Sequence, residues 1–435
     1  MSMARLMRRY ISFINKDIIQ VYIIRFSAVV LQSIAMFVVG IFLGLDDFGR
    51  FSFVFSGAQV VSVIFDMGGS IYLQKQLPAL DALYDGKGGF SELFFAFYRT
   101  MSFVLFVFIF YFLAENFLYP VSGSIANNDF FLILLTGSFF SFLDLMIAIV
   151  RVSKNASTSI FLRDALPYLL LLQLLFLLGL FDMLNVETLV LSLCVSLIIC
   201  FLVSLYIALP YLSRRKEKVN LTLIRNAEFT SFWGSAVIGA SLSQIDILIA
   251  RYFLVDAQLG LYALARRVTN LISLPQVIVN WALNVEVAYQ YAAGDGKEIL
   301  QRQAQKGLVM AVPLAIVMSL FILFLSPYWL SLFKVNVSIT IIVVLMIFIS
   351  AQIFNVLSGA NLLFASQCGQ QKYVFHTRML SLIVGVIVMV MGVYVVGPSG
   401  LAFGVFISVV LLNFMVTRRV YRTIGVWTSV PFLRI

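Results

Sequence analysis

Long apolar segments separated by short polar ones recur along the whole chain. A helix needs about 20 mostly apolar residues to cross a bilayer, and on that scale the pattern predicts twelve crossing segments. We expect them near residues 17–44, 50–72, 92–114, 129–150, 163–181, 188–210, 228–254, 261–288, 307–326, 339–363, 379–397 and 399–417. Helices are expected because isolated strands leave their backbone polar groups unpaired in lipid. The pattern predicts an all-α polytopic membrane protein.

Composition agrees with this pattern. Of 435 residues, 62% are hydrophobic and 11% are charged, whereas a soluble domain carries about 25% charge. A soluble fold needs polar cover over its surface, so a soluble enzyme, a secreted domain and a disordered chain are excluded. The basic N-terminal residues precede an apolar stretch too long for a signal peptide, so we expect the first span to be retained.

The distribution of charge predicts the topology. The net charge is +10, but most Lys and Arg residues lie in short clusters in alternate inter-span segments, as the positive-inside rule describes. This arrangement places both termini in the cytoplasm, most simply in a bacterial inner membrane, and gives no reason to expect a nucleic acid partner. Three cysteines and one histidine predict neither a disulfide framework nor a metal site, and no Walker-type nucleotide motif is present.

The chain also contains an internal repeat. When it is shifted by 211 residues, Asp47-Phe48-Gly49-Arg50-Phe51 aligns with Gln258-Leu259-Gly260-Leu261-Tyr262. Six spans per half give both halves the same orientation, which is a known plan of transporters that hold substrate between their halves. We therefore expect an N-terminal lobe at 1–210, a cytoplasmic linker at 211–225 and a C-terminal lobe at 226–435.

Charged residues inside the predicted spans are candidates for function. A charge at this depth is costly and normally faces a bundle interior or a water-filled cavity. The candidates are Arg25, Asp66, Asp144, Asp246 and Glu286, with Arg50, Arg251, Arg266 and Arg267 near the outer helix ends. A structural ion pair with a buried arginine is an alternative for the acidic positions, and snorkelling into the headgroup zone is an alternative for Arg266 and Arg267.

Polar residues on two repeat-equivalent spans recur at helical spacing. The second span carries Ser52, Ser56, Gln59 and Asp66, and the eighth carries Arg266, Asn270, Ser273, Asn280 and Asn284. Such stripes are expected if both helices line one central cavity, although interhelical hydrogen bonding is an alternative. The predicted cavity residues are Arg25, Arg50, Gln59, Asp66, Arg266, Arg267, Asn270 and Asn280. Asp66, Asp144, Asp246 and Glu286 are the candidates for coupling to H⁺ or Na⁺, and no cofactor is expected.

One part of the sequence resembles a known family. The first span ends in Phe42-Leu43-Gly44-Leu45-Asp46-Asp47-Phe48-Gly49-Arg50-Phe51, and Asp66-Met67-Gly68 follows late in the second span. These residues resemble polysaccharide-type flippases of the MOP superfamily, with most likeness to Wzx-type O-antigen translocases. The resemblance implies two six-helix lobes around a central cavity, MATE-like in plan. In the related lipid II flippase, arginines on the first, second and eighth helices line this cavity, and Arg25, Arg50 and Arg266 or Arg267 stand at similar places.

These observations lead to one main hypothesis of function and two alternatives. The resemblance implies a flippase that moves an undecaprenyl-diphosphate-linked oligosaccharide to the periplasmic leaflet, with membrane lipids, a glycan polymerase and a chain-length regulator as partners. An arginine fork suits phosphate, in agreement with an anionic head group. A cation-coupled multidrug antiporter of the same superfamily is the first alternative. A membrane glycan polymerase or glycosyltransferase is the second, and the short inter-span segments disfavour it.

Overall fold

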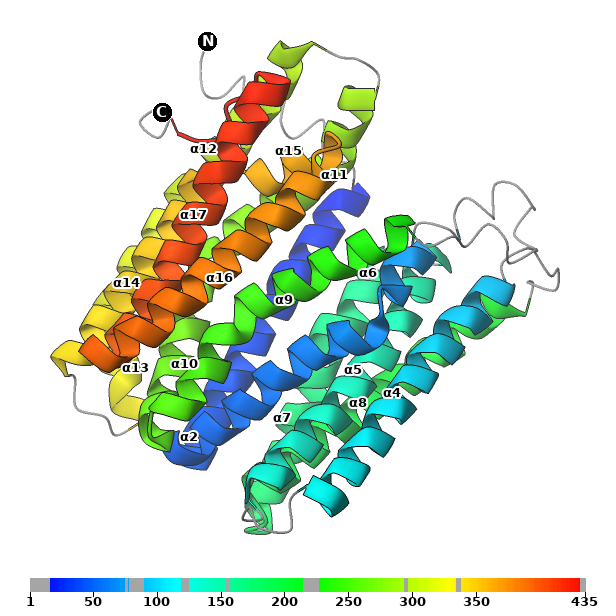
Figure 1. Ribbon diagram of the computed structural model, residues 1–435, viewed down its shortest axis with the longest axis vertical. Coiled ribbons are helices and arrows are strands. Elements are labelled where there is room, and N and C mark those ends of the chain that lie inside the picture. The colour runs from blue at the N-terminus through cyan, green and yellow to red at the C-terminus, as the bar shows by residue number, and fades with distance from the viewer. Residues whose placement is uncertain are drawn as a thin grey trace.

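The computed structural model describes residues 16–74, 77, 90–118, 125–153, 156–213, 227–292, 296–333 and 338–430, and every regular element within them is a helix. Two helical bundles lie side by side (Figure 1). The N-terminal lobe contains α2 (Lys16–Asp66), α4 (Phe90–Leu118), α5 (Ile125–Ser153), α6 (Ala156–Ile160), the π-helical turn η1 (Phe161–Ala165), α7 (Leu166–Leu180) and α8 (Val186–Leu212). The C-terminal lobe contains α9 (Ala227–Phe253), α10 (Asp256–Asn270), the 3₁₀ turn η3 (Leu271–Ser273), α11 (Leu274–Ala292), α12 (Lys297–Phe324), α13 (Ser326–Leu332), α14 (Ile339–Leu357), α15 (Asn361–Gln367), α16 (Gln371–Val396) and α17 (Pro398–Ile424).

The helices of the structure are consistent with the twelve predicted membrane crossings. Ten helices of the described chain are long and apolar enough to span a bilayer. One of them, Ile23–Asp66, has 44 residues, about twice what one crossing needs. Gly44 splits it in two, because its φ of 77° is non-helical and is a conformation that glycine adopts readily. The interrupted run α10–η3–α11 supplies a further crossing segment, so the predicted all-α membrane fold is confirmed.

Several predicted helix ends are wrong because helices continue into polar sequence. α12 begins at Lys297 instead of 307, and α17 ends at Ile424 instead of 417. The most consequential difference is that α10 begins at Asp256 and not at 261. Ten residues of helix rise about 15 Å, so Arg266 and Arg267 lie well inside the eighth span and not at its outer end.

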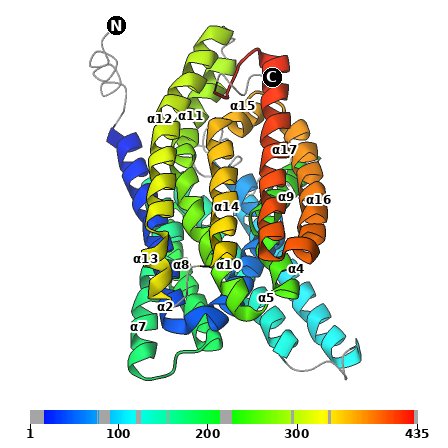
Figure 2. The ribbon, with the colours of Figure 1, turned by 90° about the vertical axis from the view of Figure 1, so that its left-hand side faces the viewer.

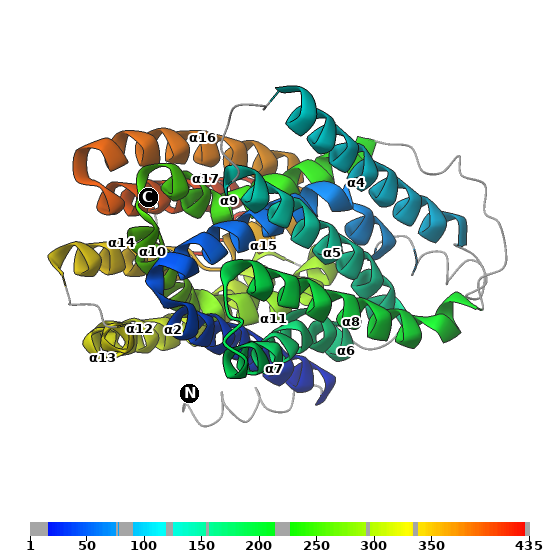
Figure 3. The same cartoon turned by 90° about the horizontal axis from the view of Figure 1, so that it is seen from below.

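The internal repeat is visible in the helix boundaries. The second part of α2 begins after Gly44, and α10 begins 211 residues later, after the extended residue Val255. α8 and α17 each have 27 residues. The predicted linker at 211–225 lies largely outside the described residues. α2 and α9–α11 run between the outer helices of the two lobes (Figure 3).

The start of α2 and the end of α17 lie towards the same end of the molecule (Figure 2). Near the opposite end, α2 of one lobe packs against α10 of the other. There, one hydrophobic cluster passes from Phe48 and Phe51 of α2 to Leu259 and Tyr262 of α10. All four side chains are at most 1% exposed. Burial of this apolar surface holds the two lobes together at this end. We call it the outer end, after the orientation that the charge pattern predicts.

Candidate functional site

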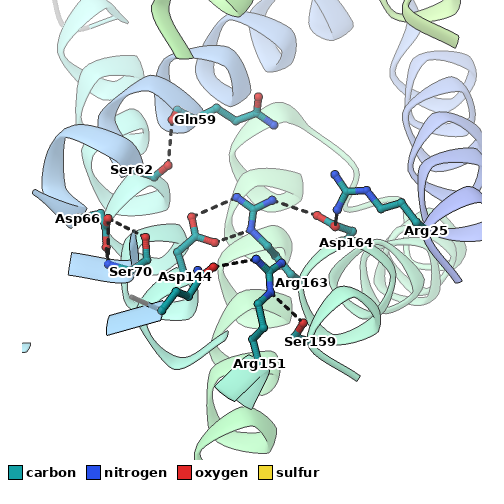
Figure 4. Close-up of polar contacts among 11 residues, drawn as sticks. Arg25, Gln59, Ser62, Asp66, Ser70, Asp144, Arg151, Ser159, Arg163 and Asp164 are labelled. Carbon is teal, nitrogen blue, oxygen red and sulfur yellow. Dashed lines mark hydrogen bonds and ion pairs between the residues drawn. The ribbon is translucent and has the colours of Figure 1, made fainter. Parts of the chain in front are cut away.

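A chain of four charged side chains runs through the N-terminal lobe (Figure 4). Arg163 lies between two carboxylates: its Nε is 2.5 Å from Oδ1 of Asp144, and its Nη1 is 3.0 Å from Oδ1 of Asp164. A second contact joins Nη2 of Arg163 to Oδ2 of Asp144 at 3.1 Å. Asp164 also forms an ion pair with Arg25 of α2. The chain therefore ties α2, α5 and η1 together through alternating charges.

The π-helical turn η1 positions the centre of this chain. A π turn inserts an extra residue into a helix, and such turns are frequent at functional sites. Here it places the adjacent residues Arg163 and Asp164 in one ionic chain. Sequence reasoning selected Arg25 and Asp144 but missed this pair, because Arg163 sits at the boundary of an apolar run and resembles a cytoplasmic anchor. Two adjacent opposite charges before the apolar run 165–181 were the available signal.

Asp66 lies near this chain but has its own partners. Its carboxylate accepts hydrogen bonds from the backbone N–H of Ser70 at 3.0 Å and from the Ser70 hydroxyl at 2.9 Å. Arg99 donates to the carbonyl of Met67 at 2.7 Å, in the turn that ends α2. Nearby, Arg151 of α5 donates to the Gln74 side chain at 2.9 Å. Asp66 thus stabilises a helix end as well as being a candidate for ion coupling.

Arg266 and Asp246 form a separate buried pair within the C-terminal lobe. Nε of Arg266 is 3.1 Å from Oδ2 of Asp246, and both residues are less than 9% exposed. Tyr262 donates to the same carboxylate oxygen at 3.3 Å. Asn270 accepts from Arg266 at 2.6 Å and from Gln352 at 2.9 Å. This arrangement is the structural ion pair that the sequence left open as an alternative.

Arg267, the next residue along, faces the other lobe. Its guanidinium lies 4.8 Å from the centre of the Phe55 ring of α2. Its Nε and Nη2 atoms are buried and have no hydrogen-bond partner among the residues that the structure describes. Tyr168 of α7 is within electrostatic range of both Arg267 and Arg163 and accepts a hydrogen bond from Gln32 at 2.9 Å. Arg267 therefore offers unused donors between the lobes.

Gln59 also lies at the contact between the lobes. Its side-chain oxygen accepts a hydrogen bond from Gln244 of α9 at 2.6 Å. Ser52 and Ser56, which precede it on the predicted stripe, are fully buried. Trp233 of α9 donates to the carbonyl of Val63 at 3.1 Å. The second span therefore contacts α9 of the other lobe at Gln59 and Val63.

Arg50 takes part in an ionic network at the outer end. Its Nε is 2.7 Å from Oδ1 of Asp129, and its Nη2 is 2.8 Å from Glu187. Arg251 of the opposite lobe approaches Oδ2 of Asp129 at 3.7 Å and pairs with Asp256. The structure places Arg50 in this cross-lobe network and does not bring it to Arg25. Sequence reasoning missed Asp129, which precedes an apolar run and resembles an ordinary helix start.

The predicted stripe on the eighth span is divided. The 3₁₀ turn η3 interrupts the helix after Asn270, so Asn280 and Asn284 do not continue the helical face of Arg266 and Asn270. Within the described residues, the buried side-chain oxygen of Asn280 has no partner. Asn284 accepts from Gln367 at 2.5 Å, and Glu286, a candidate for ion coupling, accepts from Gln290 at 3.0 Å. A single eighth-span stripe is therefore wrong, because it assumed one uninterrupted helix.

Comparisons with known proteins show which proteins this chain resembles in sequence and in fold. The MatE family model matches residues 234–391, and no curated protein sequence matches. An inward-facing multidrug resistance MATE family transporter of the MOP superfamily superposes with a TM-score of 0.69 at 15% identity, over 93% of this chain and 98% of that chain. The MATE multidrug transporter DinF-BH gives a TM-score of 0.66 at 16% identity, over 94% of this chain and 96% of that chain.

A third similar structure is a MOP superfamily transporter from Pyrococcus furiosus, described as having a binding pocket of reverse polarity. It gives a TM-score of 0.66 at 16% identity, over 95% of this chain and 97% of that chain. At these identities the likeness is one of fold, and the three solved proteins that share it are described as transporters. The narrower resemblance to Wzx-type flippases stays a prediction. The chain is therefore a multi-pass membrane protein with the fold of MATE transporters of the MOP superfamily, and its residues 234–391 match the MatE family.

Proposed function

We propose that this protein carries an anionic amphiphile across the inner membrane by alternating access of its two lobes. The specific substrate proposed is an undecaprenyl-diphosphate-linked oligosaccharide, moved towards the periplasmic leaflet. Coupling to H⁺ or Na⁺ would drive the cycle. A polar route between the lobes spares the glycan hydroxyls from entering hydrocarbon, which costs a few kcal/mol for each unpaired group.

This proposal rests on the surroundings of the Arg267 side chain. This side chain lies at the contact between the lobes, against Phe55, and two of its nitrogen atoms are buried without hydrogen-bond partners in the described part of the chain. A buried, unpaired charge is strongly unfavourable, so such an arginine is suited to an anionic ligand that completes its hydrogen bonds. A phosphate group matches the guanidinium fork in geometry and charge.

A second candidate function is export of cationic drugs by cation-coupled antiport. The MatE match and the multidrug transporters among the structural neighbours stand closer to this candidate than to the lipid-linked oligosaccharide. A drug site would use carboxylates to hold its cations. In this chain, however, Asp144 and Asp164 are both engaged by arginines. The charged side chain at the contact between the lobes is Arg267, which favours the anionic substrate.

The test uses a strain in which the gene is deleted. Lipid-linked oligosaccharide and surface glycan are quantified after complementation with the intact gene, Arg267→Gln or Arg302→Gln. Arg302 is exposed on α12, away from the contact between the lobes, and serves as the matched control. We expect the lipid-linked precursor to accumulate in the deletion strain and in Arg267→Gln, with rescue by Arg302→Gln. Unchanged precursor together with increased sensitivity to cationic dyes would overturn the proposal in favour of drug export.

A further inference from the structure

We propose that the C-terminal lobe binds an acidic phospholipid where α17 ends, with the phosphate held by Arg418, Arg419 and Arg422. The acyl chain of the lipid lies along the apolar surface of α16 and α17. These two helices form an antiparallel hairpin on the side of the molecule away from α7 and α8 (Figures 1 and 3). The site is therefore separate from the contact between the lobes, and the inference does not depend on the substrate proposed above.

The charge of the C-terminal lobe is unbalanced over its last part. Residues 299–435 contain nine Lys and Arg residues but no Asp or Glu. Four of these cations lie near the end of α17 and the start of α16, and all four are exposed: Lys372, Arg418, Arg419 and Arg422. None of them forms an ion pair with a residue that the structure describes. This cluster of cations therefore favours an anionic ligand from its surroundings.

Contacts between α16 and α17 hold Arg419 at the seam of the hairpin. Its Nε donates to the side-chain oxygen of Gln370 at 3.0 Å, and its guanidinium lies 5.0 Å from the centre of the Tyr373 ring. The Tyr373 hydroxyl donates to the carbonyl of Met415 at 3.4 Å. A guanidinium has five N–H donors, so the Nη atoms of Arg419 can bind phosphate oxygens while Nε keeps the side chain in place.

An apolar surface continues from the arginines towards the middle of the hairpin. Phe414, Arg418 and Arg422 recur every four residues, so they lie along one face of α17. Phe414 is 38% exposed, and Leu380 of α16 is 42% exposed. The other side of the hairpin is covered, since α9 packs against α16 and α14 packs against α17. A lipid whose phosphate is held by the arginines therefore has an apolar surface for its acyl chain.

The depth of the site fits the headgroup zone of a bilayer. α17 has 27 residues and is about 40 Å long, whereas the hydrocarbon core is about 30 Å thick. Its last turns therefore reach the level of the lipid phosphates. Tyr421 stacks on Trp427 there, with ring centres 3.9 Å apart, and these two residue types are enriched at membrane interfaces. Basic clusters at this level bind acidic lipid headgroups.

An acidic segment of a water-soluble protein is the other ligand that a basic cluster attracts. Such a segment would satisfy the charge of Arg418 and Arg422. It would not cover Phe414 and Leu380, which lie further into the span and are exposed to the membrane interior. A phospholipid supplies both parts in one molecule, because its phosphate and its acyl chains are joined. The arrangement of the cations above an apolar surface therefore favours the lipid.

The experiment maps lipid contacts on the full-length protein in phosphatidylcholine nanodiscs. A small fraction of the lipid is phosphatidylglycerol or phosphatidylcholine with a diazirine in one acyl chain, and crosslinked residues are identified by mass spectrometry. The variants are Arg418→Gln/Arg422→Gln and Arg418→Lys/Arg422→Lys, the second of which keeps the charge. The matched control Arg302→Gln/Lys306→Gln removes the same charge from exposed positions of α12 in the same lobe.

We expect phosphatidylglycerol to label Phe414 and Leu380 about fivefold more than phosphatidylcholine does, the order that one basic residue contributes at an acidic lipid surface. This excess should disappear in Arg418→Gln/Arg422→Gln and persist in the lysine variant and in the control. Labelling by phosphatidylcholine checks folding, because this lipid contacts the same helices in every folded variant.

Two results would overturn the proposal. Equal labelling of the wild-type hairpin by the two lipids would exclude a site for acidic lipid and favour a water-soluble acidic partner. An excess that persists without Arg418 and Arg422, or that the α12 control also loses, would show a general effect of net charge in place of a site. Neither result bears on the oligosaccharide, so failure here is distinguishable from failure of the transport test.

Discussion

Gly49 and Gly260 are 211 residues apart in the chain. Gly49 packs against the backbone of α10, and Gly260 packs against the backbone of α2. A Cβ atom added to Gly49 would lie 2.9 Å from the backbone nitrogen of Gly260 and closer still to the carbonyl oxygen of Asp256. A Cβ added to Gly260 would lie 3.2 Å from the nitrogen of Gly49 and closer still to the carbonyl oxygen of Leu45. The two contacts are repeat-equivalent, so the symmetry axis of the lobes passes near this pair.

Replacing Gly260 with alanine should force the lobes apart at the outer end. The added methyl group meets rigid backbone of α2, which cannot move aside as a flexible side chain would. Spin labels at Met183 and Ile339, which are exposed near the outer ends of the two lobes, should report a longer distance in Gly260→Ala by double electron–electron resonance. The matched control is Gly296→Ala, whose Cβ would meet nothing within 4 Å. An unchanged distance distribution would contradict this role of the glycine pair.

Asp129 should be a principal ionic link across the outer end. It is 3% exposed and lies between Arg50 of its own lobe and Arg251 of the other. Asp129→Asn leaves two arginines without this charge and should lower the thermal stability of the protein. In a double-mutant cycle with Arg251→Gln, we expect a coupling energy of about 0.5–3 kcal/mol, measured by thermal unfolding. Asp182→Asn, at an exposed position of the same end, is the control, and strictly additive effects would exclude the link.

The pair of Asp246 and Arg266 should act mainly on stability. Removing one member of a buried pair leaves an uncompensated charge, at a cost of about 3–5 kcal/mol. Asp246→Asn and Arg266→Gln should each reduce the yield of folded protein, and the double variant should recover part of it. Fluorescence-detected size-exclusion chromatography measures the yield. If Asp246→Asn is stable and abolishes ion-driven transport alone, the residue belongs to ion coupling and this prediction fails.

The three cysteines should resist alkylation in the native protein. Cys194, Cys200 and Cys368 are at most 3% exposed. Burial also raises the pKa of Cys368, which lies between α15 and α16, to about 11. Because the thiolate is the reactive form, little of it exists between pH 7 and pH 9, and labelling should stay slow up to the top of this range. Mass spectrometry after treatment with N-ethylmaleimide should find three modified cysteines only after denaturation, and rapid native labelling would contradict the burial.

Much of the fold could be predicted from the hydropathy pattern and the repeat. The length of each apolar segment is set by the bilayer, so the number of spans follows from the sequence. The ends of α10 and α12 could not be predicted in this way, since polar residues extend helices beyond the apolar run. The division of the eighth span at η3 was also hidden, because a register change leaves no mark in overall hydropathy.

The candidate site was only partly predictable. Sequence reasoning identified Arg25 and Asp144 as charges inside spans, where a charge is costly, and placed Arg267 near the outer end of its span. It could not say which charges neutralise one another. Arg266 and Arg267 are adjacent in the chain, yet one pairs with Asp246 inside its lobe and the other faces Phe55 across the lobes.

The sequence by itself determined the membrane class, the helical conformation and the two-fold repeat, because each follows from local composition or from similarity along the chain. Only the tertiary structure decided the pairing of Arg163 with Asp144 and Asp164, and of Asp129 with both lobes. The physical reason is that ion pairs depend on distances between helices that are remote in sequence. Helix packing sets those distances, and the π turn at Phe161–Ala165 sets the direction of the side chains.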